Sequence, residues 1–462
     1  MPDGQQILAA TESVCPVCLQ RIAAQRVAEG DNVYLVKHCA THGSYKTIIW
    51  RGLASYRRWA ERGPRAAPPP VLETASQRGC PHDCGLCPEH RQHSCCVLLE
   101  VTQRCNLRCP VCFASASREA DDPSLAEIET WLQRLLEHGN PVNIQLSGGE
   151  PTVRDDLPEI IRLIRARGFD FVQLNSNGLR LAKHAGYAEQ LAAAGLDCVF
   201  LQFDGVSDRV YQQIRGADLR DLKEQAIAHC AAAGLGVVLV PTLVPGVNID
   251  QIGAIVDFAL QRLPTVRAVH FQPISYFGRY PNPPADADRI TLPEVMAALE
   301  TQTAGRIRVA DLSPGSAENA FCSFSGKFFI DDQGRLQAAN AASTDCCSKA
   351  CGCGAPPPGE EAQRARRLVA KQWAAANPQR APEDSAYPIE VSSFDRFLAA
   401  RQHSFSISGM AFQDAWNLDL ERLRECFIHV VSPDRRIIPF CAYNLTNLNG
   451  ESLYRPTTCH HD

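Results

Sequence analysis

The stretch CVLLEVTQRCNLRCPVCF, residues 96–113, joins an apolar run to three closely spaced cysteines. The run predicts a buried β-strand, and the loop after it carries Cys105, Cys109 and Cys112 in the spacing C-x3-C-x2-C. Three thiols so close in sequence cannot all pair with one another, which favours metal ligation or redox exchange. Three thiolates can hold three irons of a cubane cluster and leave the fourth iron open to a ligand, whereas tetrahedral zinc requires a fourth ligand nearby.

Apolar runs of this kind recur from residue 97 to residue 300, and helix-like segments separate them. The runs are CVLLEVT, VNIQL, FVQL, CVFLQF, GVVLVPTLV and AVHFQPI. In the first helical segment, Ser124 and Glu127 predict a capping box and Gly139 predicts the end of the helix. Strands that alternate with helices predict an α/β fold, most simply a partial (β/α)6 barrel. The three cysteines then lie at the C-terminal end of a strand, where the functional groups of such folds gather.

The composition indicates a globular protein of the reducing cytoplasm. The chain has 462 residues, of which 45% are hydrophobic and 21% charged, with a formal net charge of -5. This charge argues against a nucleic-acid-binding protein, and we see neither a secretory leader nor an apolar run long enough to cross a membrane. The 21 cysteines are many for a cytoplasmic chain. In that compartment clustered cysteines indicate metal binding or catalysis rather than disulfides.

The flanking sequence differs from this regular core and divides the chain into four predicted parts. These are a rubredoxin-like or zinc-ribbon-like metal module (1–55), a spacer with an auxiliary cluster motif (56–96), the partial barrel (97–300) and a cysteine-rich auxiliary cluster region (301–462). The predicted architecture is therefore a barrel with metal-binding regions on both sides.

The second predicted strand ends in Gly148, Gly149 and Glu150. The glycines let the backbone approach a ligand closely, and the carboxylate can accept hydrogen bonds from an ammonium group. Together with the cysteine loop, this motif resembles the radical S-adenosylmethionine superfamily. The resemblance implies that a [4Fe-4S] cluster on Cys105, Cys109 and Cys112 binds S-adenosylmethionine and cleaves it to a 5'-deoxyadenosyl radical.

The resemblance also assigns cofactor-binding positions. Phe113 matches an aromatic position near the adenine, and the Gly-Gly-Glu motif matches the residues that hold the methionine amine. Polar residues at the ends of the third and fourth strands match positions that contact the ribose or the carboxylate: Asn175, Ser176, Asn177, Gln202 and Asp204. For Asn175 an ordinary turn-capping role is nearly as good an explanation.

A second C-x3-C-x2-C motif, Cys80, Cys84 and Cys87, follows a polar, proline-rich stretch and has no Gly-Gly-Glu partner. Cys95, or Cys96 in its place, could supply a fourth thiolate. We therefore expect a closed auxiliary cluster that relays electrons or stabilises the fold. The nearby histidines, His90 and His93, are predicted to be exposed loop residues.

The two ends of the chain carry further predicted metal ligands. Cys15, Cys18, Cys39 and His42 have the knuckle spacing of a tetrahedral Cys3His site, which favours zinc and leaves mononuclear iron possible. Near the other end, Cys322, Cys426 and Cys441 are predicted ligands of a further cluster. The run CCSKACGC, residues 346–353, could contribute to this cluster or form a separate metal-scavenging loop.

The segments KHCATHG (37–43), GCPHDCGLCPEHRQHSC (79–95) and IIPFCAYN (437–444) extend the resemblance along the chain. They are similar to multi-cluster radical enzymes of the tetraether synthase and methanopterin-methylating group. This resemblance implies hydrogen abstraction from an unactivated C–H bond and C–C bond formation, by methylation or alkyl coupling, on a pterin-like or lipid substrate. It further implies one or two auxiliary [4Fe-4S] clusters and a reductant such as ferredoxin or flavodoxin. A peptide-modifying radical enzyme and a non-catalytic electron carrier are the alternatives.

Overall fold

The computed structural model describes most of the chain. The described residues are 5–61, 68–69, 71–139, 142–315, 317–331, 333, 335–339, 366–367, 370, 372–374 and 404–455. The run CCSKACGC at 346–353, predicted either to contribute to the C-terminal cluster or to form a metal-scavenging loop, lies outside them.

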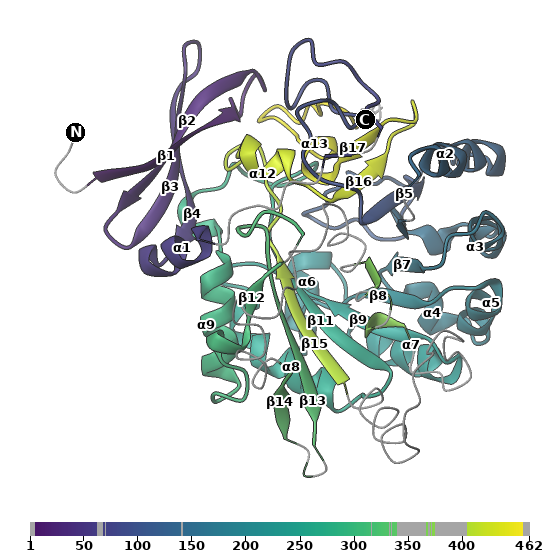
Figure 1. Cartoon of the computed structure of the whole chain (residues 1–462). Helices are drawn as coiled ribbons and strands as arrows, with labels where there is room; N and C mark the ends of the chain where they lie inside the picture. Colours follow the sequence, from purple (N-terminus) through teal and green to yellow (C-terminus); the bar gives the residue numbers. More distant parts are fainter. Residues whose placement is uncertain are drawn as a thin grey trace, which may run out of the picture.

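The N-terminal part is an antiparallel sheet of four strands in chain order, and it stands apart at the left of Figure 1. The strands are β1 (Gln5–Val14), β2 (Arg21–Glu29), β3 (Asn32–Cys39) and β4 (Gly43–Arg51), followed by helix α1 (Leu53–Ala60). Gly43 turns the chain between β3 and β4 with φ of 82°, a conformation that favours glycine. The turns at 15–20 and 39–43 place the predicted Cys3His ligands at one end of the sheet.

All six predicted core strands are present, and each pairs in parallel with the next in chain order. They are β5 (Cys96–Thr102), β6 (Asn143–Gly148), β7 (Val172–Ser176), β8 (Cys198–Gln202), β9 (Gly236–Val240) and β11 (Val266–Pro273). The predicted run GVVLVPTLV is interrupted at Pro241, which has no N–H to donate. The remainder of that run forms the short strand β10 (Thr242–Leu243), which pairs with β11.

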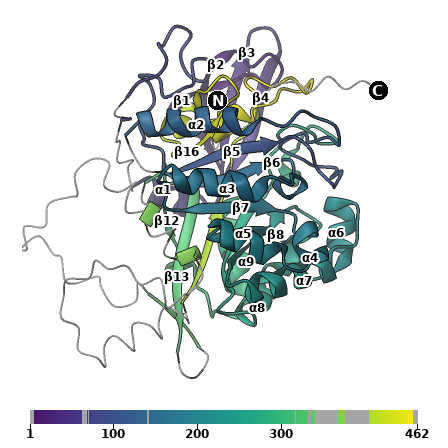
Figure 2. The same ribbon diagram turned by 90° about the vertical axis from the view of Figure 1, so that its right-hand side faces the viewer.

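Helices connect these strands, and Figure 2 shows α2, α3 and α5 stacked along one side of the sheet. The helices are α2 (Leu125–Glu137), α3 (Leu157–Ala166), α4 (Leu179–Lys183), α5 (Tyr187–Ala194), α6 (Asp208–Arg215), α7 (Arg220–Ala232), α8 (Ile252–Leu260) and α9 (Leu292–Gln302). Single 3-10 turns are η1 (Pro151–Val153), η2 (Ile249–Gln251), η3 (Asp286–Asp288) and η4 (Val309–Asp311). The capping box of α2 is confirmed, because the Ser124 hydroxyl accepts from the Glu127 N–H at 3.2 Å and the Glu127 carboxylate accepts from the Ser124 N–H at 2.8 Å.

The C-terminal part extends the same sheet at both edges, which the sequence pattern did not predict. Its elements are β12 (Ser313–Pro314), β13 (Ser323–Ile330), β14 (Leu336–Ala338), β15 (Ser404–Met410), α12 (Leu420–Arg424), β16 (Ile428–Val431), β17 (Ile437–Pro439) and α13 (Phe440–Tyr443). Strand β15 pairs in parallel with β11, and β16 pairs in parallel with β5 (Figure 1). Residues beyond 400 therefore return to the first strand of the core.

A second hydrophobic core joins the parts of the chain that carry cysteines. It contains Val14 and Leu19 from the N-terminal sheet, Cys84 from the second cysteine motif, Leu98 from β5 and Phe440 from α13. Burial of these apolar side chains fixes the metal-binding regions against one another. In the part of the chain that the structure describes, we find no helix with the length and hydropathy of a membrane span.

Candidate active site and metal centres

Hydrogen bonds fix the cysteine loop after β5 at both ends. The Cys105 N–H donates to the Ser117 carbonyl at 2.8 Å, and Cys112 exchanges two backbone hydrogen bonds with Arg279, at 2.9 and 3.0 Å. Burial raises the pKa of Cys105 to about 12, and the charges of Glu150, Cys112 and Cys109 act in the same direction. The three predicted cluster ligands therefore lie on one loop, within range of one another's charges. Cationic iron would favour their thiolate forms.

Gly148 and Gly149 bring the end of β6 directly against this loop. The N–H of Gly149 donates to the Thr102 carbonyl at 2.8 Å, and the N–H of Glu150 donates to the Arg104 carbonyl at 2.8 Å. A Cβ atom on Gly148 would collide with the Thr102 carbonyl, and one on Gly149 with the Arg104 carbonyl. The structure therefore requires glycine at both positions because two backbones meet there.

Glu150 is 1% exposed and binds the end of the neighbouring strand β7. Its carboxylate accepts from the hydroxyls of Thr152 at 2.6 Å and Ser176 at 2.8 Å, and from the N–H of Asn177 at 2.6 Å. Burial raises the pKa of Glu150, and these hydrogen bonds oppose the rise. The Asn177 amide in turn donates to the Asn106 side chain at 2.7 Å, which connects β7 to the cysteine loop.

Asn175 and Gln202, two other predicted polar positions, have protein partners. The Asn175 side chain accepts from Gln145 and donates to the Ser147 hydroxyl at 3.4 Å. Gln202, with its amide oxygen turned toward Arg215, accepts from that guanidinium at 3.1 Å. Contact of these two residues with a ribose stays a prediction.

Asp204 is fully buried, and its partner Arg215 is a residue that sequence reasoning missed. The Arg215 guanidinium donates to both carboxylate oxygens of Asp204, at 2.7 and 2.8 Å. Burial alone would lower the pKa of Arg215, but the charges of Asp204 and Cys109 raise it above its usual value. Asp204 therefore holds a cation beside a predicted cluster ligand.

Lys223 of α7 is a second missed residue. It is fully buried, donates to the Asn177 carbonyl, and has a pKa that burial lowers to about 8. In the sequence, Lys223 could have been noticed only as a lysine on an otherwise apolar face of the helix. The sequence alone did not show which group its ammonium would contact. Two basic side chains and one carboxylate thus lie beneath the strand ends: Arg215, Lys223 and Asp204.

The C-terminal tail reaches the cysteine loop from the other side. Phe113, the predicted adenine neighbour, is half-buried with its ring centroid 5.9 Å from that of Phe440. Arg455 forms a buried ion pair with Glu100 of β5 and lies 5.9 Å from the Phe113 ring. The end of the described chain thus contributes to the surroundings of the cluster loop.

The four predicted N-terminal ligands converge as the spacing indicates. The ligand atoms of Cys15, Cys18, Cys39 and His42 all lie within 4.8 Å of one another. A hydrogen bond from the Thr41 backbone lowers the pKa of Cys39 to about 6, and a bond with His42 acts in the same direction. Three thiols and one imidazole at these separations fit a single tetrahedral metal ion.

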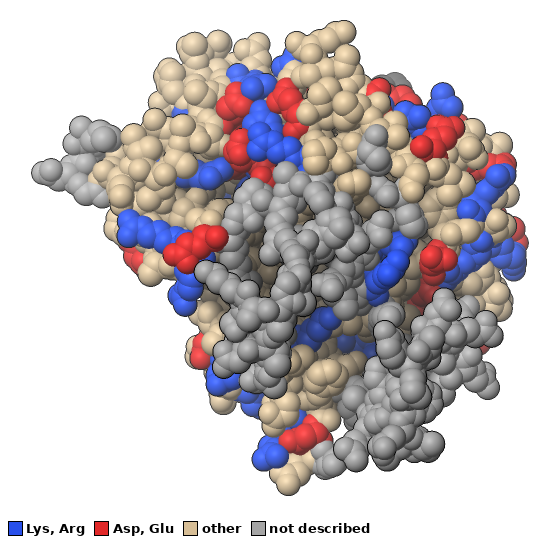
Figure 3. Space-filling view, viewed as in Figure 1, with Lys and Arg blue, Asp and Glu red and all other residues tan. Residues whose placement is uncertain are grey.

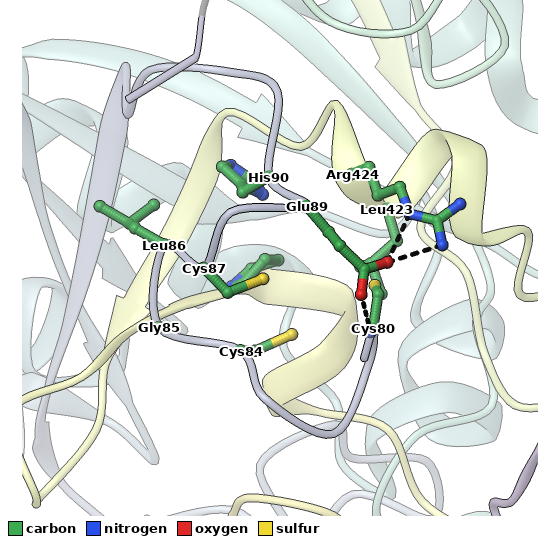
Figure 4. A pocket seen from close by; sticks show the side chains of 10 residues that line it. Cys80, Cys84, Gly85, Leu86, Cys87, Glu89, His90, Leu423 and Arg424 are labelled. Atoms are coloured by element: carbon green, nitrogen blue, oxygen red, sulfur yellow. Dashed lines mark hydrogen bonds and ion pairs between the residues drawn. The ribbon is translucent and has the colours of Figure 1, made fainter. Parts of the chain in front are cut away.

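The second cysteine motif forms a small pocket beneath α12 (Figure 4). Cys80, Cys84 and Cys87 line this pocket, and a hydrogen bond with Cys80 raises the pKa of Cys84, with burial and the charge of Cys87 adding to the rise. Tyr454 accepts a hydrogen bond from the Cys84 N–H at 2.9 Å. The three thiols are therefore neighbours.

Cys95, the predicted fourth ligand, does not line this pocket. Its N–H donates to the Phe427 carbonyl at 2.8 Å, and the charges that act on its thiol are those of Cys96, Glu318 and Arg366. The pairing of the adjacent strand β5 with β16 carries Cys95 away from the motif that precedes it in sequence.

The prediction that His90 is exposed was wrong. His90 is 5% exposed, and its Nε2 lies 3.1 Å from Nε2 of the fully buried His429 on β16. Burial lowers the pKa of His90 to about 4. His93 is half-buried.

The predicted C-terminal ligands also converge, although they come from three separate segments. Burial raises the pKa of Cys426 well above its usual value, and the charges of Cys441 and Cys322 raise it further. Cys441 lies at the start of α13, Cys426 between α12 and β16, and Cys322 just before β13. The fold thus places these three thiols within range of one another's charges.

Comparison with known proteins agrees with this geometry. Residues 99–259 match the model of the radical SAM superfamily, and residues 7–51 match the HMPTM N-terminal zinc ribbon domain. The chain therefore belongs to the radical SAM superfamily of enzymes, and it carries an N-terminal zinc ribbon. It is 35% identical over 479 residues to 7,8-dihydro-6-hydroxymethylpterin dimethyltransferase of Methanocaldococcus jannaschii, an alignment that covers 94% of this chain and 93% of that protein.

Other similarities are restricted to part of the chain. A probable GTP 3',8-cyclase of Methanococcus maripaludis is 32% identical over 178 residues, which cover 38% of this chain and 58% of that protein. The crystal structure of Streptococcus suis SuiB bound to S-adenosylmethionine aligns with a TM-score of 0.38 and 16% identity, covering 46% of this chain and 48% of that one. The predicted superfamily and enzyme class are confirmed, and the superfamily implies S-adenosylmethionine and a [4Fe-4S] cluster as cofactors.

Proposed function

We propose that this enzyme methylates a reduced pterin, 7,8-dihydro-6-hydroxymethylpterin or a close relative, at an unactivated carbon. The observation that carries the proposal is the 35% identity to a dimethyltransferase of that pterin, which extends over 94% of the chain. The similarity includes the zinc ribbon and the C-terminal part as well as the core. This favours methylation over peptide modification, and a pterin over a lipid, as substrate.

In this proposal Cys105, Cys109 and Cys112 hold the catalytic cluster, and Cys80, Cys84 and Cys87 hold an auxiliary one. The arrangement of the catalytic thiols fits such a group, because three thiols within range of one another's charges lie on a loop fixed by Ser117 and Arg279. A cluster there, once reduced, would supply the electron that cleaves S-adenosylmethionine into methionine and a 5'-deoxyadenosyl radical. We further infer that the six core strands curve into a partial (β/α)6 barrel around this site.

The protein's own residues prepare the site for that cofactor. Gly148 and Gly149 hold the end of β6 against the cysteine loop, and Glu150 joins it to the end of β7. Asp204 holds the Arg215 guanidinium beside Cys109, where it can neutralise thiolate or carboxylate charge. Phe113 and Phe440 supply an apolar wall next to the loop. The radical would take a hydrogen atom from the pterin to give 5'-deoxyadenosine, and the pterin radical would then form a C–C bond with the methylene carbon of a reduced folate-type donor.

The proposal assigns the enzyme to the cytoplasm, with a ferredoxin or flavodoxin as reductant. Its test is an anaerobic assay of reconstituted enzyme with S-adenosylmethionine, dithionite, 7,8-dihydro-6-hydroxymethylpterin and a reduced folate that carries a methylene group. The separate carbon donor is needed because the methionine released from S-adenosylmethionine keeps its methyl group. We expect 5'-deoxyadenosine and a pterin that gains one or two methyl groups by mass spectrometry, and neither product from a Cys109→Ala variant. Cleavage of S-adenosylmethionine without pterin methylation, but with coupling of a supplied lipid, would reject the pterin as substrate.

A further inference from the structure

The core strands present two different faces. On β8, Val199 and Leu201 belong to the main hydrophobic core, which also contains the apolar side chains of α2, α3 and α5, whereas Phe200 between them belongs to a separate small cluster. On β11, His270 likewise lies between two residues of the main core. Because successive side chains of a strand point to opposite faces, Phe200 and His270 lie on the face of the sheet opposite these helices.

Three aromatic side chains meet on this inner face. The ring centroids of Phe200 and His270 are 6.0 Å apart, and Trp373 lies 4.8 Å from Phe200 and 6.4 Å from His270. Trp373 comes from a segment 100 residues beyond β11 and remains partly exposed. We refer to these three residues as the ring cluster. Aromatic groups at such distances can hold a further planar ring by offset stacking or edge-to-face contact.

His270 adds a polar group to the ring cluster. Its Nδ1 atom lies 2.8 Å from the Ser408 hydroxyl on the neighbouring strand β15, which fixes the orientation of the imidazole. Its Nε2 atom has no hydrogen-bond partner among the described residues. Burial lowers the pKa of His270 to about 4, so the ring is neutral near pH 7. Because a serine hydroxyl both donates and accepts, Nε2 can take either role toward a ligand.

Polar side chains continue the inner face across β7 and β6. Asn175 is the in-register neighbour of Phe200, and its side chain accepts from the Gln145 amide at 2.5 Å. Neighbouring strands lie about 4.8 Å apart, so the sheet from β7 to β11 is about 14 Å wide. Amide groups at one side and the ring cluster at the other thus enclose a width that suits a planar bicyclic molecule.

The accessible positions of the inner face are mostly polar. Val238 and Ala268 are fully buried, whereas these polar residues remain partly exposed: Gln145, Asn175, Gln202, Gln272 and Ser408. A lipid chain would require a continuous apolar surface in their place. On the described part of the surface in Figure 3, acidic and basic side chains mostly lie side by side. A polyanionic substrate would instead require a basic patch. The inner face therefore fits a neutral ring system with polar edges.

We propose that the reduced pterin binds on this inner face with its ring against the ring cluster, and that Nε2 of His270 and the amide of Gln145 form hydrogen bonds with its polar edges. His270 is then a specificity-determining residue, because a ring without polar atoms would leave Nε2 without a partner in a buried place. This assignment rests on the proposed function, since it takes a pterin as the substrate.

The test is a binding measurement that does not require turnover. Anaerobic calorimetry with reconstituted full-length enzyme and S-adenosylmethionine, without reductant, gives the affinity for 7,8-dihydro-6-hydroxymethylpterin. His270→Phe keeps a ring and removes both nitrogens, so it should weaken pterin binding about tenfold or more, as expected for the loss of a buried hydrogen bond. His270→Gln, whose amide extends about as far as Nε2, should restore part of the affinity. His184→Phe, an exposed histidine just after α4, is the matched control and should bind as the wild type does.

Specificity is read from a second ligand, 2-naphthalenemethanol, which has a bicyclic ring without polar ring atoms. The wild-type preference for the pterin over this compound should shrink about tenfold or more in His270→Phe, because the variant loses only the polar contact. Affinity for S-adenosylmethionine, measured on the same samples, reports that the fold persists. Should His270→Phe lose both ligands, Phe200→Leu takes its place, since it leaves the bond between His270 and Ser408 intact and should also weaken pterin binding.

The outcomes separate this assignment from the proposed function. Equal pterin affinities of the wild type, His270→Phe and Phe200→Leu would overturn the assignment and leave the pterin as substrate. A wild-type enzyme that binds S-adenosylmethionine but no pterin would reject the proposed substrate and, with it, the assignment.

Discussion

Asp204 at the end of β8 holds Arg215 at the end of α6 in a two-point ion pair, with N–O distances of 2.7 and 2.8 Å. Asp204 is fully buried and Arg215 is 8% exposed. The Arg215 guanidinium also interacts with Cys109, one of the predicted cluster ligands. The ion pair therefore connects the ends of the strands to the predicted cluster. Asp204 thus anchors a cation, and its predicted contact with the cofactor stays a prediction.

Replacing Asp204 by asparagine should therefore affect both stability and cofactor cleavage. The change leaves Arg215 buried without its anion, which should cost about 3 kcal/mol or more in the free energy of unfolding. Formation of 5'-deoxyadenosine should fall roughly tenfold or more. Each ~1.4 kcal/mol of lost transition-state stabilisation lowers the rate by a factor of about ten. Denaturant titration and product analysis measure the two effects.

Asp155→Asn is the control for this variant. Asp155 pairs with Arg180 at 2.8 Å, but its side chain is 93% exposed. Its loss should change stability by less than about 1 kcal/mol. If the two variants behaved alike, the buried pair would have no special role.

The local part of the site could be predicted from the sequence, since Cys105, Cys109 and Cys112 lie within one loop and Gly148 and Gly149 within one turn. The N-terminal ligands were predictable for the same reason, because two knuckles fix them. Whether Cys95 joins Cys80, Cys84 and Cys87 stays a prediction, since proximity in sequence does not reveal that β5 pairs with β16, more than 300 residues away. Arg215 was missed because its contact with Cys109 joins two distant segments, and no periodicity encodes that contact.

Gly149→Ala should lower the iron content of the catalytic site. The new methyl group would collide with the Arg104 carbonyl and displace the cysteine loop, at a cost of about 1–3 kcal/mol. Gly139→Ala is the control, because a Cβ there meets open space and only the positive φ of 71° opposes it. Iron and sulfide analysis of the two reconstituted variants should show a deficit in the first alone. Equal contents would show that the loop tolerates the displacement.

The stability of the enzyme should rise between pH 8 and pH 10 because of Lys223. Burial lowers the pKa of Lys223 to about 8, whereas an unfolded lysine titrates near 10.4. Between these values the unfolded chain binds more protons, so the free energy of unfolding rises by up to about 1.4 kcal/mol per pH unit.

Unfolding titrations under anaerobic conditions check the sign of this pH dependence. Lys223→Met should remove the slope, and Lys183→Met, which changes an exposed lysine of α4, should retain it. A slope that persists in Lys223→Met would assign the titration to another group.

Removal of the ribbon metal should loosen the C-terminal tail as well as the ribbon. The Leu448 N–H donates to the Pro16 carbonyl at 2.8 Å, and the Asn447 amide donates to the Val17 carbonyl at 3.0 Å, so the turn between Cys15 and Cys18 is bound directly to the tail. Structural zinc supplies much of the folding free energy of small modules. We therefore expect His42→Ala, or a chelator, to release the zinc and speed proteolysis near residues 15–20 and 447–448.

His38→Ala is the matched control for the ribbon prediction. His38 is exposed, and its ring bonds to the Ser44 hydroxyl at 2.9 Å rather than to the ligand set. Zinc content and cleavage rate should stay at the wild-type level in this variant. The same tail contains Arg455, which pairs with Glu100, and Phe440, whose ring lies near that of Phe113. Zinc loss should therefore also reduce the yield of 5'-deoxyadenosine. Full retention of cofactor cleavage after zinc release would show that the ribbon is a structural appendage without influence on the active site.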